Sequence, residues 1–207
     1  MTRVAAVAPR SAGGPAAGQA AAIAGQTAAG TVELTIAATI EAGHRSGAEL
    51  LWMLDGGAVP GPDALEHLLG AISEPGAAAL VTGLPLDERG VPLDGLTPRG
   101  VQELPAMLAA APRRRMAVRY AHLSNTLVRR EAVDRHGLPR PALGPYAARE
   151  WTSRVLEGGS TWLVPQSRVT RPPEHGSLRD LPAAVRMART DACTGWDAIR
   201  GFAGFVR

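Results

Sequence analysis

Several side chains of this sequence have the type and position needed for chemistry. Asp55 directly follows the apolar run Leu50–Leu54, and its carboxylate, with waters, could bind Mg²⁺ or could instead cap the following turn. The consecutive arginines Arg113–Arg115 could hold a phosphate through paired N–H donors or form a solvated charged face. The single cysteine, Cys193, excludes an intrachain disulfide and is more typical of a packed residue than of a nucleophile.

The charge composition argues against several classes of partner. All 22 basic residues are arginine, which keeps its charge at any accessible pH and binds phosphate as a planar fork. The net charge is only +3 and the arginines are dispersed among acids, so a nucleic-acid partner is not expected. No apolar run approaches the roughly 18 residues that cross a bilayer, and the alanine-rich start, broken by Pro9 and Pro15, is a poor secretory signal. We therefore expect a cytoplasmic protein without a membrane span.

The elements that would position Asp55 can be predicted from periodicity. Short apolar and β-branched runs at 3–8, 31–36 and 49–55 alternate with helical patterns at 16–28 and 38–46. This β-α-β-α-β order predicts a parallel sheet covered by helices. The run at 49–55 is apolar without alternation, which is typical of a strand buried on both faces. Ligands of such sheets bind beyond the carboxyl ends of the strands, and Asp55 would lie at one of these ends.

The rest of the chain predicts further elements of both kinds. They are a helix at 63–72, a strand at 77–83, a polar loop at 84–98, a helix at 101–111, a strand-like stretch at 116–128, helices at 131–136 and 146–157, and a strand at 161–164 ended by Pro165. From 177 to 207 the pattern is mostly helical, and Phe202 and Phe205 would share one helix face that needs an apolar partner. We therefore expect one domain over residues 1–175 and a helical segment at 176–207, which packs on the domain or forms a homodimer.

Three segments, in this order, resemble the family 2 nucleotide-sugar glycosyltransferases of the GT-A fold. The first, at 50–65, is an apolar strand that runs into an acid, a proline turn and a helix. The second is the strand and Arg-Arg-Glu-Ala turn at 123–138, and the third is the helix, Gly-Gly pair and strand at 150–165. The resemblance implies an α/β fold, with a GT-A-like (Rossmann-related), mostly parallel sheet flanked by helices. It also implies transfer of a sugar from a nucleotide diphosphate donor to a hydroxyl acceptor.

The resemblance implies a donor site with a divalent metal, Mg²⁺ or Mn²⁺, held by an acidic cluster. Asp55 matches that cluster as a metal or donor ligand, and His175 stands about where the family has a metal-binding histidine. Gly56 and Gly57 replace the additional carboxylates, so the motif is degenerate and the metal could be absent. His175 could equally be a surface residue.

The resemblance also places a catalytic acid near the start of the third segment. Glu150 matches this acid and would deprotonate the acceptor hydroxyl. An ion pair with Arg154, four residues later on the helix, would explain Glu150 equally well. Ala147 and Ala148 stand where the family has further acids, and Arg149 could then neutralise the leaving diphosphate directly.

Two polar residues lie in the second segment, on what the resemblance implies is the acceptor side. Ser124 and Asn125 could contact the acceptor or could satisfy backbone groups. The region before Glu49 looks about one strand-helix unit shorter than in the family, which removes its usual donor contacts. The glycines and alanines in place of acids favour an alternative function, a catalytically silent GT-A-like protein that acts as a binding or scaffold subunit.

Overall fold

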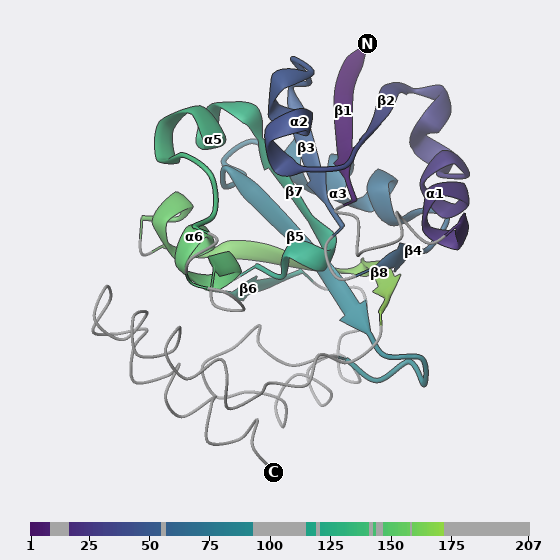
Figure 1. Cartoon of the computed structure of the whole chain (residues 1–207). Coiled ribbons are helices and arrows are strands. Elements are labelled where there is room, and N and C mark those ends of the chain that lie inside the picture. Colours follow the sequence, from purple (N-terminus) through teal and green to yellow (C-terminus); the bar gives the residue numbers. More distant parts are fainter. Residues whose placement is uncertain are drawn as a thin grey trace.

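A computed structural model describes residues 1–8, 17–54, 57–92, 115–118, 121–140, 143, 147–157 and 159–171 (Figure 1). The strands in these ranges are β1 (Thr2–Val7), β2 (Val32–Ala37), β3 (Leu50–Met53), β4 (Val59–Pro60), β5 (Leu80–Leu86), β6 (Met116–Val118), β7 (Thr126–Arg129) and β8 (Thr161–Thr170). The helices are α1 (Ala17–Ala24), α2 (Ile40–Arg45), α3 (Ala64–Ile72), α5 (Arg130–His136) and α6 (Ala147–Val155), with short 3₁₀ turns η1 (Thr27–Gly30) and η3 (Leu123–Asn125).

The strands form one sheet in the order β2-β1-β3-β7-β5-β8-β4, and β6 pairs with β8 beside this path. β1 lies between β2 and β3 in parallel pairings, and β5 runs parallel to β8. β7 is antiparallel to both of its neighbours, β3 and β5. Strands β1, β2, β3, β5 and β8 therefore run in one direction, and their carboxyl ends share one edge of the sheet. The predicted α/β class is confirmed, with a mostly parallel sheet flanked by helices.

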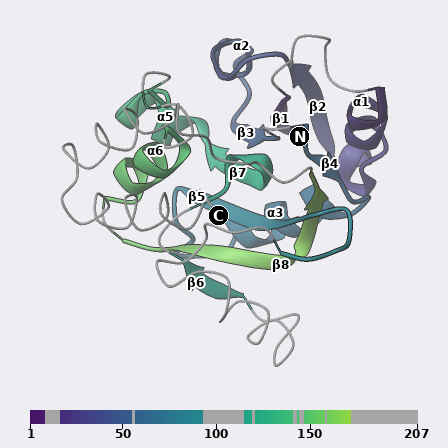
Figure 2. The same ribbon diagram turned by 60° about the horizontal axis from the view of Figure 1, so that its bottom comes forward.

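Helices cover both faces of the sheet (Figure 2). α1 and α3 pack on one face, and α2, α5 and α6 pack on the other. Along β3, Leu50 and Trp52 face the first layer, whereas Leu51 and Met53 face the second. All four side chains are buried, which explains why this strand is apolar at every position. The prediction of a central strand buried on both faces is confirmed.

A β-bulge lets β8 continue across the sheet. Gly83 of β5 pairs with Val164 of β8, whereas the next residue, Leu84, pairs with Arg168, so the pairing skips residues 165–167. The strand was predicted to end at Pro165, which is wrong: it runs on to Thr170. A bulge accepts proline because its residues leave the hydrogen-bonded ladder, where the missing amide N–H would otherwise cost a bond.

The stretch at 116–128, predicted as one strand, is two. β6 pairs with β8 on the outer side of the sheet, whereas β7 inserts between β3 and β5. Both strands run antiparallel to β5 and β8, so they have the same direction and are separated in the sheet by β5 and β8. The predicted polar loop begins later than expected, because β5 extends to Leu86. The predicted helix at 101–111 and the segment at 176–207, with its predicted dimer contact, lie outside the described residues. No helix in the described ranges is long and apolar enough to cross a bilayer.

Candidate functional site

The carboxyl edge of the sheet brings together segments that are far apart in the sequence. β3 ends at Met53, which pairs with Thr126 at the start of the antiparallel strand β7. η3 directly precedes β7, so its residues lie beside the end of β3. β4 pairs with the last residues of β8, so the turn between β3 and β4 links the centre of this edge to the end of β8. Asp55 lies between β3 and β4 in the sequence, and residues 55 and 56 are outside the described ranges.

An amide on α1 holds the backbone on both sides of residues 55 and 56. Gln19 is 1% exposed, and its Nε2 donates to the carbonyl oxygens of Leu54 (3.1 Å) and Ala58 (2.9 Å). Gln26 supports the following loop and the first turn of α3 in the same way. The two amides therefore fix where this turn leaves the sheet and where it returns. Sequence reasoning missed both, because their segment was predicted only as a helix of small residues.

A buried polar network joins η3 to β3 and β8. The Asn125 side chain is fully buried, and its Oδ1 accepts a hydrogen bond from Trp52 Nε1 at 3.1 Å. Its Nδ2 donates to the carbonyl and hydroxyl oxygens of Ser167, at 3.0 Å each. Ser124 is equally buried. Both predicted acceptor-side residues therefore face the protein interior. The contacts of Asn125 agree with the alternative prediction, in which these side chains satisfy polar groups of the protein itself.

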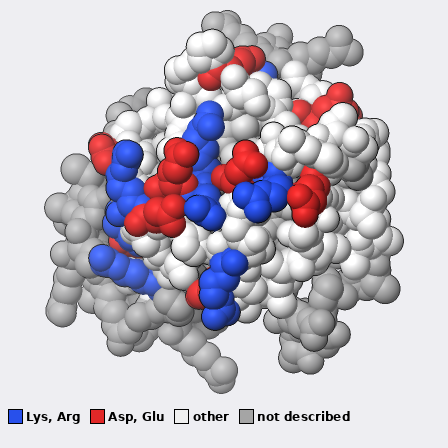
Figure 3. All heavy atoms as spheres, turned by 90° about the horizontal axis from the view of Figure 1, so that it is seen from above, with Lys and Arg blue, Asp and Glu red and all other residues white. Residues whose placement is uncertain are grey.

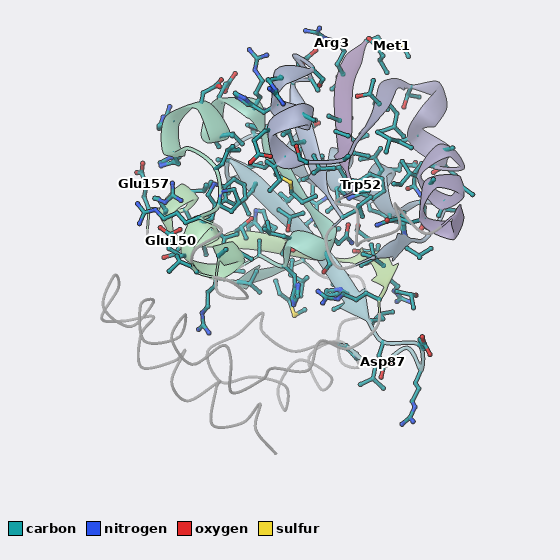
Figure 4. The ribbon with its side chains drawn as sticks, viewed as in Figure 1. Met1, Arg3, Trp52, Asp87, Glu150 and Glu157 are labelled. Atoms are coloured by element: carbon teal, nitrogen blue, oxygen red, sulfur yellow. The ribbon has the colours of Figure 1, made fainter. Side chains whose placement is uncertain are left out.

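Glu150 forms an ion pair with Arg154 on the same helix, and Arg154 in turn joins α6 to the end of α5. Its carboxylate is 9% exposed and receives two hydrogen bonds from the Arg154 guanidinium, at 3.0 and 3.1 Å. Arg140 lies 3.6 Å from the same carboxylate. Arg154 also donates to two carbonyl oxygens at the end of α5. Figure 4 shows Glu150 on α6, apart from Trp52 on β3. The expected pair four residues apart is present, whereas catalysis by Glu150 stays a prediction.

The other predicted site residues are divided between described and undescribed parts of the chain. Arg149 lies in the first turn of α6 and is half-buried. Arg115 forms an ion pair with Glu74. Arg113–Arg114 and His175 lie outside the described residues. Their roles, like that of Arg149 in binding diphosphate, stay predictions.

The described residues do not test the predicted metal site, because its predicted ligands Asp55 and His175 lie outside the described ranges. No group of three or more His, Cys, Asp or Glu side chains in the described ranges is arranged to hold a metal ion. Arg171, directly after β8, is only 3% exposed, and its Nη1 lies 3.4 Å from His122 Nδ1. A guanidinium is permanently charged and can only donate hydrogen bonds, so it repels a cation placed beside it.

The opposite edge of the sheet, formed by the amino ends of the parallel strands, carries charges of both signs (Figure 3). Arg3 lies 3.9 Å from Glu49, and Asp134 lies 2.6 Å from His44 and 3.7 Å from Arg130. Two surface hollows also open at this side of the molecule. One is lined mainly by α5 and the end of α6, and the other by the starts of β1 and β3, the end of α3 and residues 129–131. Interspersed, exposed charges contribute little to stability and are typical of a solvated face rather than of a basic binding patch.

Comparisons with known proteins identify a similar fold but no sequence relative. No protein-family model matches the chain, and no curated protein is similar to it in sequence. The crystal structure of GalNAc-T7 with UDP, GalNAc and Mn²⁺ matches 91% of this chain with a TM-score of 0.54 and 14% identity. The match covers 47% of that protein, so the chain spans about half its length. A197 from STIV matches 86% of this chain and 97% of its own, with 13% identity and a TM-score of 0.44, too low to support an argument.

The fold is therefore similar to that of the GT-A glycosyltransferases, as the sequence predicted. At 14% identity the likeness concerns the fold alone and does not single out family 2. Folds of this kind host several chemistries, so function has to be argued from the residues at the carboxyl edge.

Proposed function

We propose that this chain binds a nucleotide diphosphate sugar at the carboxyl edge of its sheet and transfers the sugar to a hydroxyl acceptor. The observation that carries the proposal is that the buried central strand β3 ends at this edge, in a GT-A-like fold, and that Asp55 follows it in the sequence after a single residue, Leu54. The similar structure of GalNAc-T7 contains UDP and GalNAc, which supports a donor of the same class. Because this chain spans about half of that protein, the donor and acceptor are proposed by class only.

Within this proposal, Asp55 is the donor-side carboxylate, and the Gln19 amide holds the ends of its turn. Asn125 and Ser124 shape the acceptor side through their buried network rather than by touching the acceptor. Arg149 remains a candidate for contact with the diphosphate. A divalent cation at this edge would be held by Asp55 and His175 and would neutralise the charge of the diphosphate.

Replacing Asp55 with asparagine is expected to weaken binding of the nucleotide sugar about tenfold or more. The reason is that a charged carboxylate, which would accept hydrogen bonds from the hydroxyl groups of this ligand, would be lost. Isothermal titration with a panel of uridine, guanosine and thymidine diphosphate sugars measures this directly. The matched control is Asp134→Asn, the same chemical change at an exposed ion pair on the opposite edge, which should leave donor affinity unchanged. Absence of binding by the unmodified chain across the whole panel would contradict the proposed function.

The contacts of Glu150 favour a second candidate function, donor binding without turnover. A general base needs a carboxylate oxygen that can reach the acceptor proton, whereas both oxygens of Glu150 already accept from Arg154. In this alternative the chain is a binding or scaffold subunit that retains the donor site. The two candidates differ in a simple measurement, since only the transferase releases nucleoside diphosphate in the presence of acceptor alcohols.

If the chain does turn over, Glu150→Gln is expected to retain activity within about tenfold, below the roughly 10²–10⁴-fold loss typical of a missing general base. The physical reason is that glutamine keeps one acceptor oxygen for Arg154 and removes only the charge. Release of nucleoside diphosphate is the measurement, and Glu157→Gln, at an exposed carboxylate, is the control. A loss of the larger size with unchanged donor affinity would assign proton transfer to Glu150 after all.

A further inference from the structure

One hollow at the amino edge of the sheet differs from the solvated charges around it. Its volume is about 300 Å³, at the lower end of the roughly 300–1,000 Å³ that is typical of small-molecule sites. The starts of β1 and β3, the end of α3 and residues 129–131 form its walls. Figure 3 shows this face of the molecule, where arginine and carboxylate side chains lie side by side. The hollow is therefore large enough for a small polar ligand.

Two arginine side chains from distant parts of the sequence converge at Gly47, which lines this hollow. Gly47 follows α2 and has a φ of +76°, in the left-handed region that favours glycine. Arg3 Nη1 lies 3.7 Å, and Arg130 Nη1 lies 3.9 Å, from the point that a Cβ atom on Gly47 would occupy. Arg3 belongs to β1 and Arg130 to α5. Because like charges repel, this arrangement favours an anionic group between the two guanidinium groups.

The carboxylate partners of Arg3 and Arg130 lie beyond hydrogen-bond distance. Arg3 Nε is 3.9 Å from Glu49 Oε1, and Arg130 Nε is 3.7 Å from Asp134 Oδ2. All four side chains are more than 40% exposed, and exposed pairs of this kind contribute little to stability. Both arginines can therefore turn toward a ligand at small cost. Arg129, by contrast, is a fixed part of the wall, because its Nη2 donates to a carbonyl oxygen at the end of α3 at 2.6 Å.

The other polar residues of the hollow add hydrogen-bond acceptors and a hydroxyl group. Glu49, Glu131 and Ser73 line it together with the arginines. A carboxylate repels a bare inorganic anion, but it accepts hydrogen bonds from the hydroxyl groups of a ligand. The lining therefore suits a molecule that carries both a phosphate group and several hydroxyl groups.

We propose that this hollow binds a sugar phosphate, with the phosphate group between Arg3 and Arg130. A guanidinium group matches paired phosphate oxygens through two parallel N–H donors, and two such groups would enclose the phosphate from both sides. The sugar hydroxyls would then donate to Glu49 and accept from Ser73. The inference does not depend on the proposed function, because the hollow lies at the opposite edge of the sheet from the carboxyl end of β3.

Calorimetric titration of the unmodified chain with glucose 6-phosphate, inorganic phosphate and glucose tests this site. Glucose 6-phosphate is expected to bind about fivefold more tightly than inorganic phosphate, and glucose should give no measurable heat, because the charged hydrogen bonds are the stronger ones. Arg3→Met should weaken binding of glucose 6-phosphate about tenfold, and Arg3→Lys less, since lysine keeps the charge but loses the planar fork. The control is Arg45→Met, which removes the same charge from an exposed residue of α2 outside the lining of the hollow.

Glu49→Gln gives a second measurement, with an effect of the opposite sign. Because it removes a negative charge from the lining, inorganic phosphate should bind about threefold more tightly. The preference for glucose 6-phosphate over inorganic phosphate should become smaller, since a neutral amide is a weaker acceptor for the sugar hydroxyls than a carboxylate.

Three results would overturn the inference. Equal affinities for inorganic phosphate and glucose 6-phosphate would mean that the hollow holds an adventitious ion only. Equal losses for Arg3→Met and Arg45→Met would mean that binding follows the net charge of the chain rather than this hollow. Absence of heat with all three compounds would mean that the hollow binds no sugar phosphate. None of these results bears on the proposed function, which the nucleotide-sugar titration of Asp55→Asn tests separately.

Discussion

Replacing Gly83 with alanine is expected to destabilise the folded chain by roughly 3 kcal/mol and to lower its melting temperature by roughly 6–12 °C. A Cβ at this position would overlap the Asn125 side-chain nitrogen and would lie 2.5 Å from the Ser167 carbonyl oxygen. Asn125 cannot move aside without losing its hydrogen bonds to Trp52 and Ser167. The Ser167 carbonyl is backbone and cannot shift without disturbing the β8 bulge. Thermal and urea unfolding followed by circular dichroism measure the effect.

A matched substitution on α3 separates this effect from that of adding a methyl group in general. Gly70 is exposed in the helix, and a Cβ there meets no heavy atom within 4 Å. Gly70→Ala should therefore stabilise the chain slightly, by about 0.5–1 kcal/mol, because alanine loses less conformational freedom than glycine in a helix. The same chemical change is thus expected to have opposite signs at the two positions. Similar melting temperatures for the two variants would show that the network around Asn125 is not tightly packed.

The fold could be predicted from the sequence where one periodic pattern determines one element. The uninterrupted apolar run at 50–54 predicted a strand buried on both faces, and β3 is such a strand. The alternation of strands and helices before it predicted the parallel order of β1, β2 and β3. Strand direction further along the chain could not be predicted, because β7 has the same kind of apolar pattern as its neighbours yet runs antiparallel between them.

The bulge in β8 shows why the end of this strand was predicted wrongly from the local sequence. Pro165 predicts the end of a strand when each residue is assumed to need its amide N–H for the ladder. In the folded chain, Asn125 reaches across from η3 and bonds to Ser167, so the bulge is stabilised by a residue about forty positions away. An interaction over such a sequence separation leaves no periodic signal, and the continuation of β8 to Thr170 could not be inferred from residues 161–170 alone.

The candidate site likewise contains residues that could be predicted from the sequence and residues that could not. The place of Asp55 after a buried strand followed from the pattern, but the residues that support the edge did not. Gln19 and Gln26 are the polar residues of an alanine-rich segment, and that contrast was a usable signal for a buried amide with specific partners. Arg171 had no such signal, because 22 arginines are distributed along the chain and only the fold shows which of them is withdrawn from water.

Replacing Arg154 with methionine is expected to cost about 2–3 kcal/mol of folding free energy, because it leaves a buried carboxylate without its main partner. The Arg154 guanidinium donates to both oxygens of Glu150 and to the carbonyl oxygens of His136 and Leu138, so one side chain joins α6 to the end of α5. Methionine keeps much of the apolar packing of the stem, so the loss reports mainly on the charged head. Urea unfolding at neutral pH, read as a change in midpoint at constant slope, measures the cost.

Arg130→Met is the control, because Arg130 and Asp134 form another pair four residues apart, but both side chains are more than 40% exposed. Exposed pairs contribute about 0–1 kcal/mol, so this variant should unfold close to the unmodified chain. The double variant Arg154→Met with Glu150→Gln should regain about 1 kcal/mol relative to Arg154→Met alone, since glutamine removes the unpaired charge. Equal losses for Arg154→Met and Arg130→Met would mean that the carboxylate of Glu150 is not an anchor of the α5–α6 junction. Glu150 would then remain a candidate general base, because its carboxylate would not be needed for the stability of the fold.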